Sequence, residues 1–183
     1  FEHVAGSRRP YVASWDGTVW SSLSTGMNER VWDLIWFDEG TGPGLFAGGW
    51  FTTAGLAAAR HVAKWLPSTE TWQPLGAGPD FLVNSFAAYD DGSGAALQAV
   101  GRVTTSGTTP IAKWNGVAWS NVGGWPAWGI GSPPMICCAE TYDDGSGPAL
   151  YVCGDLYFNP AGAERIAYWD GSSWSKPPAE PNG

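Results

Sequence analysis

A short motif with two tryptophans is written four times along this chain, and that repetition limits the fold more than any other feature. The copies are VASWDGTVW from Val12, VAKWLPSTETW from Val62, IAKWNGVAW from Ile111 and IAYWDGSSW from Ile166. Their first tryptophans follow one another at intervals of 50, 49 and 55 residues. Periods of this size are typical of proteins in which each repeat forms one small sheet and packs on its neighbours.

Each copy of the motif predicts a β-hairpin. In three copies an Asp-Gly or Asn-Gly pair stands between the two tryptophans: Asp16-Gly17, Asn115-Gly116 and Asp170-Gly171. These pairs adopt the positive φ angles of a two-residue turn more readily than other residues do. A hairpin with one tryptophan on each strand is therefore expected in every repeat.

A glycine-rich turn predicts a second hairpin in each repeat. It reads DEGTGPG from Asp38, DDGSGAA from Asp90 and DDGSGPA from Asp143, and strand-like runs lie on both sides of each copy. One full period therefore holds four short strands, predicted at 31–37, 45–51, 61–65 and 72–75; at 83–89, 97–103, 111–114 and 119–122; and at 136–142, 150–158, 166–169 and 174–176. The run VWDLIWF at 31–37 is apolar on both faces, so we expect it to be buried between sheets.

Composition supports an all-β fold and excludes two classes of partner. The chain of 183 residues has 26 Gly, 14 Pro and 13 Trp, with only nine Lys plus Arg. Turn formers and aromatic residues thus outweigh charged helix formers. The formal charge of −8 opposes binding to nucleic acid or to anionic lipid, and no apolar run approaches the roughly 18 residues that span a bilayer.

These motifs together resemble kelch-like β-propeller repeats. They are more similar to the tandem Trp- and Gly-rich repeats (IAxWDGSSW…YDDGSGPALY) of large, uncharacterised secreted bacterial proteins. Two departures from kelch stand out. The diglycine is complete only at Gly48-Gly49 and becomes Val100-Gly101 and Cys153-Gly154, and tryptophan replaces the tyrosine of the aromatic pair. The resemblance implies a propeller with four-stranded antiparallel blades of about 50 residues and an extracellular location.

The repeat boundaries follow from this alignment. A single domain over 1–183 is expected to hold a partial unit (1–26), three complete repeats (27–78, 79–125 and 126–177, here the first, second and third repeats) and a tail (178–183). Phe1 precedes Trp15 by the same 14 residues that separate Phe51 from Trp65. The chain therefore opens within a repeat, and we expect further sequence upstream.

The paired acids of the glycine-rich turns are the nearest approach to a metal site. The pairs are Asp38-Glu39, Asp90-Asp91 and Asp143-Asp144. Calcium prefers six to eight oxygen ligands, and these turns lack the alternating acids and distal Glu of a calcium loop. A hairpin turn closed by its own Asp side chains is favoured. Calcium binding at Asp90, Asp91, Asp143 and Asp144 stays open.

The tryptophans divide into two groups. Eight recur at fixed repeat positions and are expected to pack between sheets: Trp15, Trp20, Trp65, Trp72, Trp114, Trp119, Trp169 and Trp174. Five do not recur and are the candidates for an exposed, ligand-binding surface such as a sugar platform: Trp32, Trp36, Trp50, Trp125 and Trp128.

Catalytic and cofactor motifs are not found in the sequence. His3 and His61 have no recognisable partner, and no serine stands in G-x-S-x-G. SWDGTVW is similar to the Asp box of sialidases, which is itself a structural hairpin.

The three cysteines lack zinc-ligand spacing. Cys138 and Cys153 fall opposite each other on adjacent predicted strands, so a disulfide and a pair of packed thiols are both open.

The sequence therefore favours a non-enzymatic, extracellular structural or interaction module without a cofactor. Three and a half repeats leave open sheet faces, and we expect the chain to associate with further chain or with other copies rather than stay a free monomer. A four-bladed ring with one thin blade is the alternative for closure. For function, a carbohydrate-binding propeller is the alternative, and part of a secreted glycoside hydrolase is a more distant one.

Overall fold

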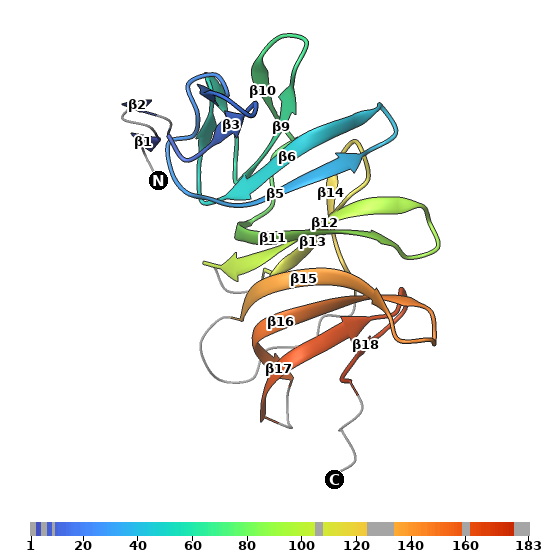
Figure 1. The fold of residues 1–183 in the computed structure, drawn as a ribbon. Coiled ribbons are helices and arrows are strands. Elements are labelled where there is room, and N and C mark those ends of the chain that lie inside the picture. The colour runs from blue at the N-terminus through green and yellow to red at the C-terminus, as the bar shows by residue number, and fades with distance from the viewer. Residues whose placement is uncertain are drawn as a thin grey trace.

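The computed structural model describes residues 3–4, 7–8, 10–104, 108–123, 134–158 and 162–177. Every regular element in these residues is a β-strand, which confirms the all-β prediction (Figure 1). The described part of the chain contains no helix of the length and apolar character needed to cross a membrane.

The first repeat forms one antiparallel four-stranded sheet. Its strands are β5 (Val31–Asp38), β6 (Pro43–Gly49), β9 (Val62–Leu66) and β10 (Thr71–Pro74), and they are hydrogen-bonded in the order β5-β6-β9-β10. The glycine-rich turn joins β5 to β6, and the tryptophan hairpin is β9–β10. Both predicted hairpins are therefore confirmed in this repeat.

The second and third repeats pair in the same way. The strands are β11 (Phe81–Asp90), β12 (Ala95–Val103), β13 (Ile111–Trp114), β14 (Trp119–Asn121), β15 (Met135–Asp143), β16 (Pro148–Phe158), β17 (Gly162–Trp169) and β18 (Trp174–Ser175). Each repeat pairs its four strands in sequence order. One further pair, Arg102 with Met135, joins the two sets into a single curled sheet.

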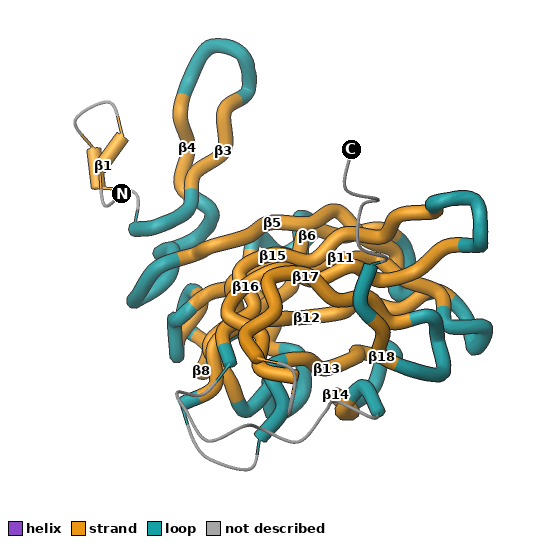
Figure 2. The backbone as a smooth tube through the Cα atoms, turned by 90° about the horizontal axis from the view of Figure 1, so that it is seen from below, coloured by secondary structure: helices purple, strands orange, loops and turns teal. Residues whose placement is uncertain are grey.

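Three small hairpins complete the fold. They are β1 (His3–Val4) with β2 (Ser7–Arg8), β3 (Ala13–Trp15) with β4 (Trp20–Ser22), and β7 (Thr53–Ala54) with β8 (Ala57–Ala58). The β3–β4 hairpin carries the first copy of the tryptophan motif and projects beyond the sheet of the first repeat (Figure 2).

The first strand of every repeat has a β-bulge at the same place. The register shifts at Trp32, Asn84 and Cys137, next to the glycines that pair with the start of these strands, Gly49, Gly101 and Gly154. A Cβ at any of these glycines would collide with a backbone carbonyl oxygen of the facing strand. The second glycine of the diglycine therefore recurs in all three repeats. The first glycine is replaced by Val100 and Cys153 in the later repeats, although a Cβ on Gly48 itself would meet the side chains of Phe86 and Val83.

The hydrophobic core lies in layers between successive units. One layer joins the partial unit to the first repeat through Val12, Met27, Ala47 and Phe51. A second layer lies between the first and second repeats around Phe37, Phe46, Val83 and Phe86, and a third lies between the second and third repeats around Tyr89, Val100, Ile136 and Leu150. Each repeat thus buries its apolar side chains mainly against its neighbours.

The prediction that VWDLIWF is buried on both faces is wrong. Trp32, Leu34 and Trp36 on β5 are 51%, 45% and 64% exposed. The alternate residues Ile35 and Phe37 pack against the second repeat. In the described chain β5 is therefore covered on the side of the second repeat, and its other side stays open because the partial unit contributes only the β3–β4 hairpin there.

Candidate interaction surfaces at the ends of the repeat array

The recurring tryptophans of the complete repeats pack inside the molecule. Trp65, Trp114 and Trp169 are all buried, as predicted. The same prediction is wrong for Trp15 and Trp20 of the partial unit, which are 50% and 37% exposed. In every hairpin the two indole rings lie with their centroids 5.2 to 5.5 Å apart, a distance at which aromatic side chains contact each other directly.

The second tryptophan of each hairpin also links its repeat to the preceding unit. Trp72 Nε1 donates to the carbonyl oxygen of Leu23 at 3.0 Å, and Trp119 Nε1 donates to that of Leu75 at 3.0 Å. Trp174 Nε1 donates to the carbonyl oxygen of Gly123 in the second repeat at 3.2 Å. These tryptophans therefore hold successive units together.

The first acid of each turn pair closes its own turn. Asp38 Oδ1 accepts hydrogen bonds from the amides of Gly40 and Gly42 at 2.8 and 3.0 Å. Asp90 and Asp143 make the same two bonds in their repeats. The turn-cap hypothesis is thus confirmed for these three acids. Among the described residues no group of three His, Cys, Asp or Glu side chains gathers as a metal would require.

In the first repeat, the second acid of the turn pair joins two repeats. Glu39 Oε1 accepts from Lys64 Nζ at 2.7 Å, and Glu39 Oε2 accepts from Trp114 Nε1 of the second repeat at 2.7 Å. Partial burial raises the pKa of Glu39, but the bonds from Lys64 and Trp114 outweigh it and hold the pKa below the ordinary value. Sequence reasoning missed this contact, although an acid at this position recurs in every turn.

The second turn acid has different hydrogen-bond partners in the other two repeats. Asp91 pairs with Lys113 at 2.8 Å, and this bond lowers the pKa of the Asp91 carboxyl. In the third repeat Tyr168 replaces the lysine, and Asp144 accepts instead from the hydroxyl groups of Ser146 and Tyr151.

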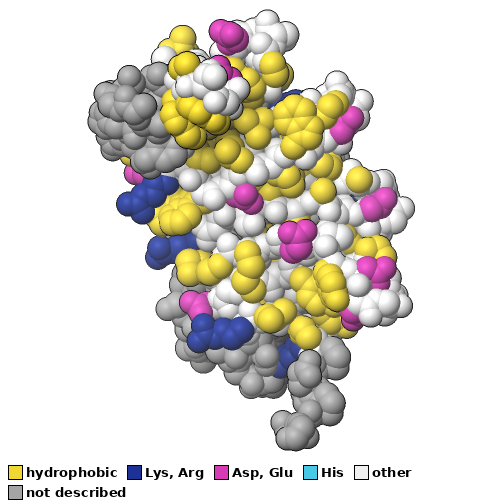
Figure 3. Space-filling view, viewed as in Figure 1, with side chains coloured by type: hydrophobic (Ala, Val, Ile, Leu, Met, Phe, Trp, Pro, Cys, Tyr) yellow, Lys and Arg dark blue, Asp and Glu magenta, His cyan; other side chains and the backbone are white. Residues whose placement is uncertain are grey.

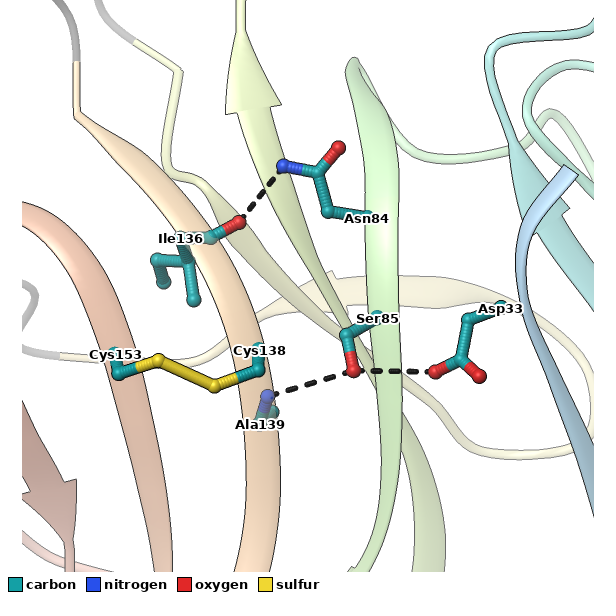
Figure 4. The surroundings of a disulfide bond; sticks show 7 residues. All are labelled: Asp33, Asn84, Ser85, Ile136, Cys138, Ala139 and Cys153. Carbon is teal, nitrogen blue, oxygen red and sulfur yellow. Dashed lines mark hydrogen bonds between the residues drawn. A yellow bond between two sulfur atoms is a disulfide. The ribbon is translucent and has the colours of Figure 1, made fainter. Parts of the chain in front are cut away.

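The first strands of the three repeats are connected by side chains. Asp33 Oδ2 accepts from the Ser85 hydroxyl at 3.1 Å and from the Phe86 amide at 2.7 Å, and Ser85 Oγ accepts from the Ala139 amide at 3.4 Å (Figure 4). Asp33 and Ser85 each stand five residues before the first turn acid. The side chain at this position in one repeat thus bonds the following repeat.

The third repeat carries Cys138 at that position. Cys138 and Cys153 are register partners on β15 and β16 and form a disulfide, which decides between the two alternatives that the sequence left open. Figure 4 shows the bridge beside the Asp33–Ser85–Ala139 series. Cys137 is a free, exposed cysteine.

The non-recurring tryptophans are only partly an exposed surface. Trp32 and Trp36 are exposed, whereas Trp50 is half-buried, with its ring centroid 5.4 Å from that of Trp32. Trp50 Nε1 donates to Asn84 Oδ1 at 3.3 Å. Trp125 and Trp128 lie outside the described residues. We call the exposed residues Trp32, Leu34 and Trp36 the β5 patch.

A second exposed apolar surface lies on the third repeat. Tyr142 and Ile166 are 59% and 48% exposed, and the ring of Tyr151 contacts those of Tyr142 and Tyr168. The equivalent residues in the other repeats are buried against the next repeat: Phe37 and Tyr89 for Tyr142, and Val62 and Ile111 for Ile166. We call Tyr142, Tyr151, Ile166 and Tyr168 the third-repeat patch.

Grooves between units recur with the repeat. They have volumes of about 410, 330 and 420 Å³ and lie at the three successive junctions, beside Trp65, Trp114 and Trp169 respectively. A groove found once per junction follows from the packing of the repeats. Several acidic side chains mark the edge where the glycine-rich turns project, and apolar side chains lie across the strands (Figure 3).

No protein family model, curated protein or solved structure matches the chain.

Proposed function

We propose that this chain is a non-enzymatic interaction module built of propeller repeats, acting outside the cell. Two observations support a propeller whose blades are the three repeats. Each repeat is a four-stranded antiparallel unit stacked against the next, and side chains link the first strands of neighbouring repeats. The disulfide is compatible with an oxidising, extracellular setting.

The observation that carries this proposal is a difference in burial between equivalent residues. Ile166 is 48% exposed, whereas Val62 and Ile111 are fully buried by the repeat that follows them. Complete burial of such a side chain is favourable by about 1.5–3 kcal/mol. The third-repeat patch therefore gains free energy when another unit of this kind, in a further copy or in further chain, covers it.

Light scattering on the purified chain tests the proposal. We expect a concentration-dependent mass above the 19.4 kDa of one chain. Ile166→Asp should return the mass to that of a monomer, because a charge in the contact costs free energy on burial. Val117→Asp is the matched control, since Val117 is 80% exposed at a hairpin turn. A wild-type chain that stays monomeric at every concentration would contradict the proposal.

A carbohydrate-binding module is the second candidate, and one cluster favours it. The rings of Trp32 and Trp50 lie side by side, and the Arg30 guanidinium is 5.8 Å from the centroid of Trp50. The exposed indole of Trp32, with the half-buried Trp50 and a cation beside it, is suited to stacking on a sugar ring that carries a carboxylate. A glycan array read by tryptophan fluorescence, with Trp32→Ala as the control, tests this candidate, and no quenching by any sugar would exclude it.

A further inference from the structure

We propose that the free edge of β3 and the β5 patch together form an acceptor site for a β-hairpin with the sequence of the repeat's own first half. This inference rests on the proposed function, because it treats the β3–β4 hairpin as the second half of a four-stranded unit. The incoming hairpin would complete that unit.

The edge of β3 is the first part of the site. The equivalent strands β9, β13 and β17 each pair on both sides, whereas β3 pairs with β4 alone among the described residues. Asp16 N donates to Val19 O across the hairpin. Because antiparallel strands alternate their bonding direction, the backbone groups of Trp15 and Ala13 point to the opposite, open edge. That edge can accept one more strand.

The pairing register of the site follows from the other repeats. Trp65, Trp114 and Trp169 each stand opposite a leucine of the neighbouring strand, and the residue two positions earlier stands opposite a small apolar one. An incoming strand should therefore place its leucine opposite Trp15 and a residue such as Ala99 opposite Ala13.

The β5 patch is the second part of the site. Leu34 is 45% exposed, but the residues at its position in the next two repeats, Phe86 and Ala139, are buried. Each is covered by the preceding repeat. The Asp33 side chain also accepts a hydrogen bond from the Phe86 amide, and the Ser85 side chain accepts one from the Ala139 amide. The Leu34 amide instead donates to its own Asp33 side chain at 2.8 Å. An incoming first strand would cover Leu34 as the earlier repeats cover Phe86 and Ala139.

The segment 81–103 of this chain carries every feature that the site needs. It forms a hairpin with Ser85 at the position that bonds the following repeat, Asp91 as the second turn acid and Leu97 opposite the tryptophan. By analogy with Glu39 and Trp114, its Asp91 would accept from the indole of Trp65. Gly101 gives it the bulge that every first hairpin of the complete repeats contains.

The experiment titrates a fluorescein-labelled peptide of residues 81–103 into the intact chain and follows anisotropy. A second form, with Ser85→Cys and Val100→Cys oxidised, copies the Cys138–Cys153 bridge, because residues 85 and 100 are register partners too. The bridge holds the two strands in register before binding, so this form should bind more tightly than the linear peptide even though it lacks the Ser85 hydroxyl. We expect saturable binding and new protection of the Ala13 and Trp15 amides from hydrogen exchange.

Matched variants locate the binding. Ala13→Pro removes a donor from the open edge and should weaken binding at least tenfold, whereas Ala13→Val keeps the donor and should bind as wild type. Leu34→Asp should weaken binding to a similar extent, and a Gly101→Val peptide should not bind. Ser85→Ala in the linear peptide should cost about fivefold, the worth of one hydrogen bond.

Two outcomes would overturn the inference. One is that neither the linear nor the bridged peptide binds, and the other is that binding ignores both Ala13→Pro and Leu34→Asp. The Ile166→Asp chain separates this result from the proposed function. Its third-repeat patch is disabled while the acceptor site is unchanged, so it should still bind the peptide. Self-association without peptide binding would defeat this inference and leave the proposed function standing.

Discussion

At the scale of single residues, the recurring side chains have roles set by their neighbours in the next or preceding repeat. Trp114 contacts Trp119 within its own hairpin and donates to Glu39 of the preceding repeat. Trp15 is its sequence equivalent, yet it is 50% exposed. Tryptophan at the same repeat position is therefore buried in the second repeat and exposed in the partial unit.

This contrast gives a direct prediction. Trp114→Ala should lower the free energy of unfolding by about 3–5 kcal/mol, the cost of removing a large aromatic side chain from a core. Trp15→Ala is the matched control and should cost less than about 1 kcal/mol, as expected for a surface substitution. Urea titration followed by circular dichroism measures both values. Equal losses for the two variants would show that position in the array does not set the burial.

The lowered pKa of the Glu39 carboxyl predicts how the free energy of unfolding depends on pH. Its pKa in the folded state lies below the ordinary value of 4.5, so its contribution is complete above that pH and is lost as pH falls through the folded-state pKa. Asp91 acts in the same direction from an ordinary value of 3.8. The contributions of Glu39 and Asp91 to the urea midpoint should therefore stay level from pH 7 to about pH 5 and fall in more acid solution. Burial lowers the pKa of His61 from its ordinary value of 6.5, so His61 adds a separate fall that begins below that pH.

Glu39→Gln should lower the midpoint at pH 7 and make the acid fall shallower. Asp80→Asn is the control, because the Arg60–Asp80 ion pair also links the first and second repeats but is exposed on both side chains. If Glu39→Gln leaves the acid profile unchanged, the Lys64–Glu39–Trp114 contact does not contribute to stability.

At the scale of elements, the repeated bulge explains which glycines recur. Gly101 stands beside the bulge of β11, where a Cβ would collide with the Leu82 carbonyl oxygen. Backbone cannot move aside as a flexible side chain can. The recurrence of this glycine is visible in the sequence, whereas its cause, a facing carbonyl brought close by a bulge, is visible only in the structure.

Gly101→Ala should therefore cost about 1–3 kcal/mol, the usual range for overpacking. Gly123→Ala is the matched control, because a Cβ on Gly123 meets no atom within 4 Å. Thermal unfolding of the two variants measures the difference. A Gly101→Ala variant as stable as the wild type would mean that β11 and β12 separate without cost at the bulge.

At the scale of the whole molecule, the layers of core are unequal because only the second repeat has a complete repeat on each side. Core layers on both of its faces bury Phe86, Val100 and Ile111. The β3–β4 hairpin, by contrast, is exposed over both of its strands apart from the half-buried Ala13. Stability in repeat arrays is close to a sum of such nearest-neighbour contacts.

The rates of amide hydrogen exchange should differ among the repeats according to how many neighbouring units cover each one. Amides of β11 and β12 should exchange slowest, those of β15 to β17 next, and those of β3 and β4 first, because protection depends on the free energy of local opening. Mass spectrometry of labelled peptides measures the order. A uniform rate across all repeats would show that the chain opens as one cooperative unit.

The sequence by itself determined the period, the two hairpins of each repeat, the closing role of Asp38, Asp90 and Asp143 and the facing positions of Cys138 and Cys153 on adjacent strands. All of these depend on contacts within about 25 residues, which turn chemistry and strand alternation fix locally. Burial of Trp65, Trp114 and Trp169 could also be predicted, because a residue at a fixed repeat position faces a repeated interface.

Only the tertiary structure decided which apolar faces are covered. VWDLIWF reads as a strand buried on both sides, yet Trp32, Leu34 and Trp36 are exposed. The Asp33–Ser85–Ala139 series and the Glu39–Trp114 bond were equally out of reach, because each joins residues more than 50 positions apart. A sequence pattern records that a side chain prefers to be buried. Whether a neighbour is present to bury it depends on how the whole array is assembled.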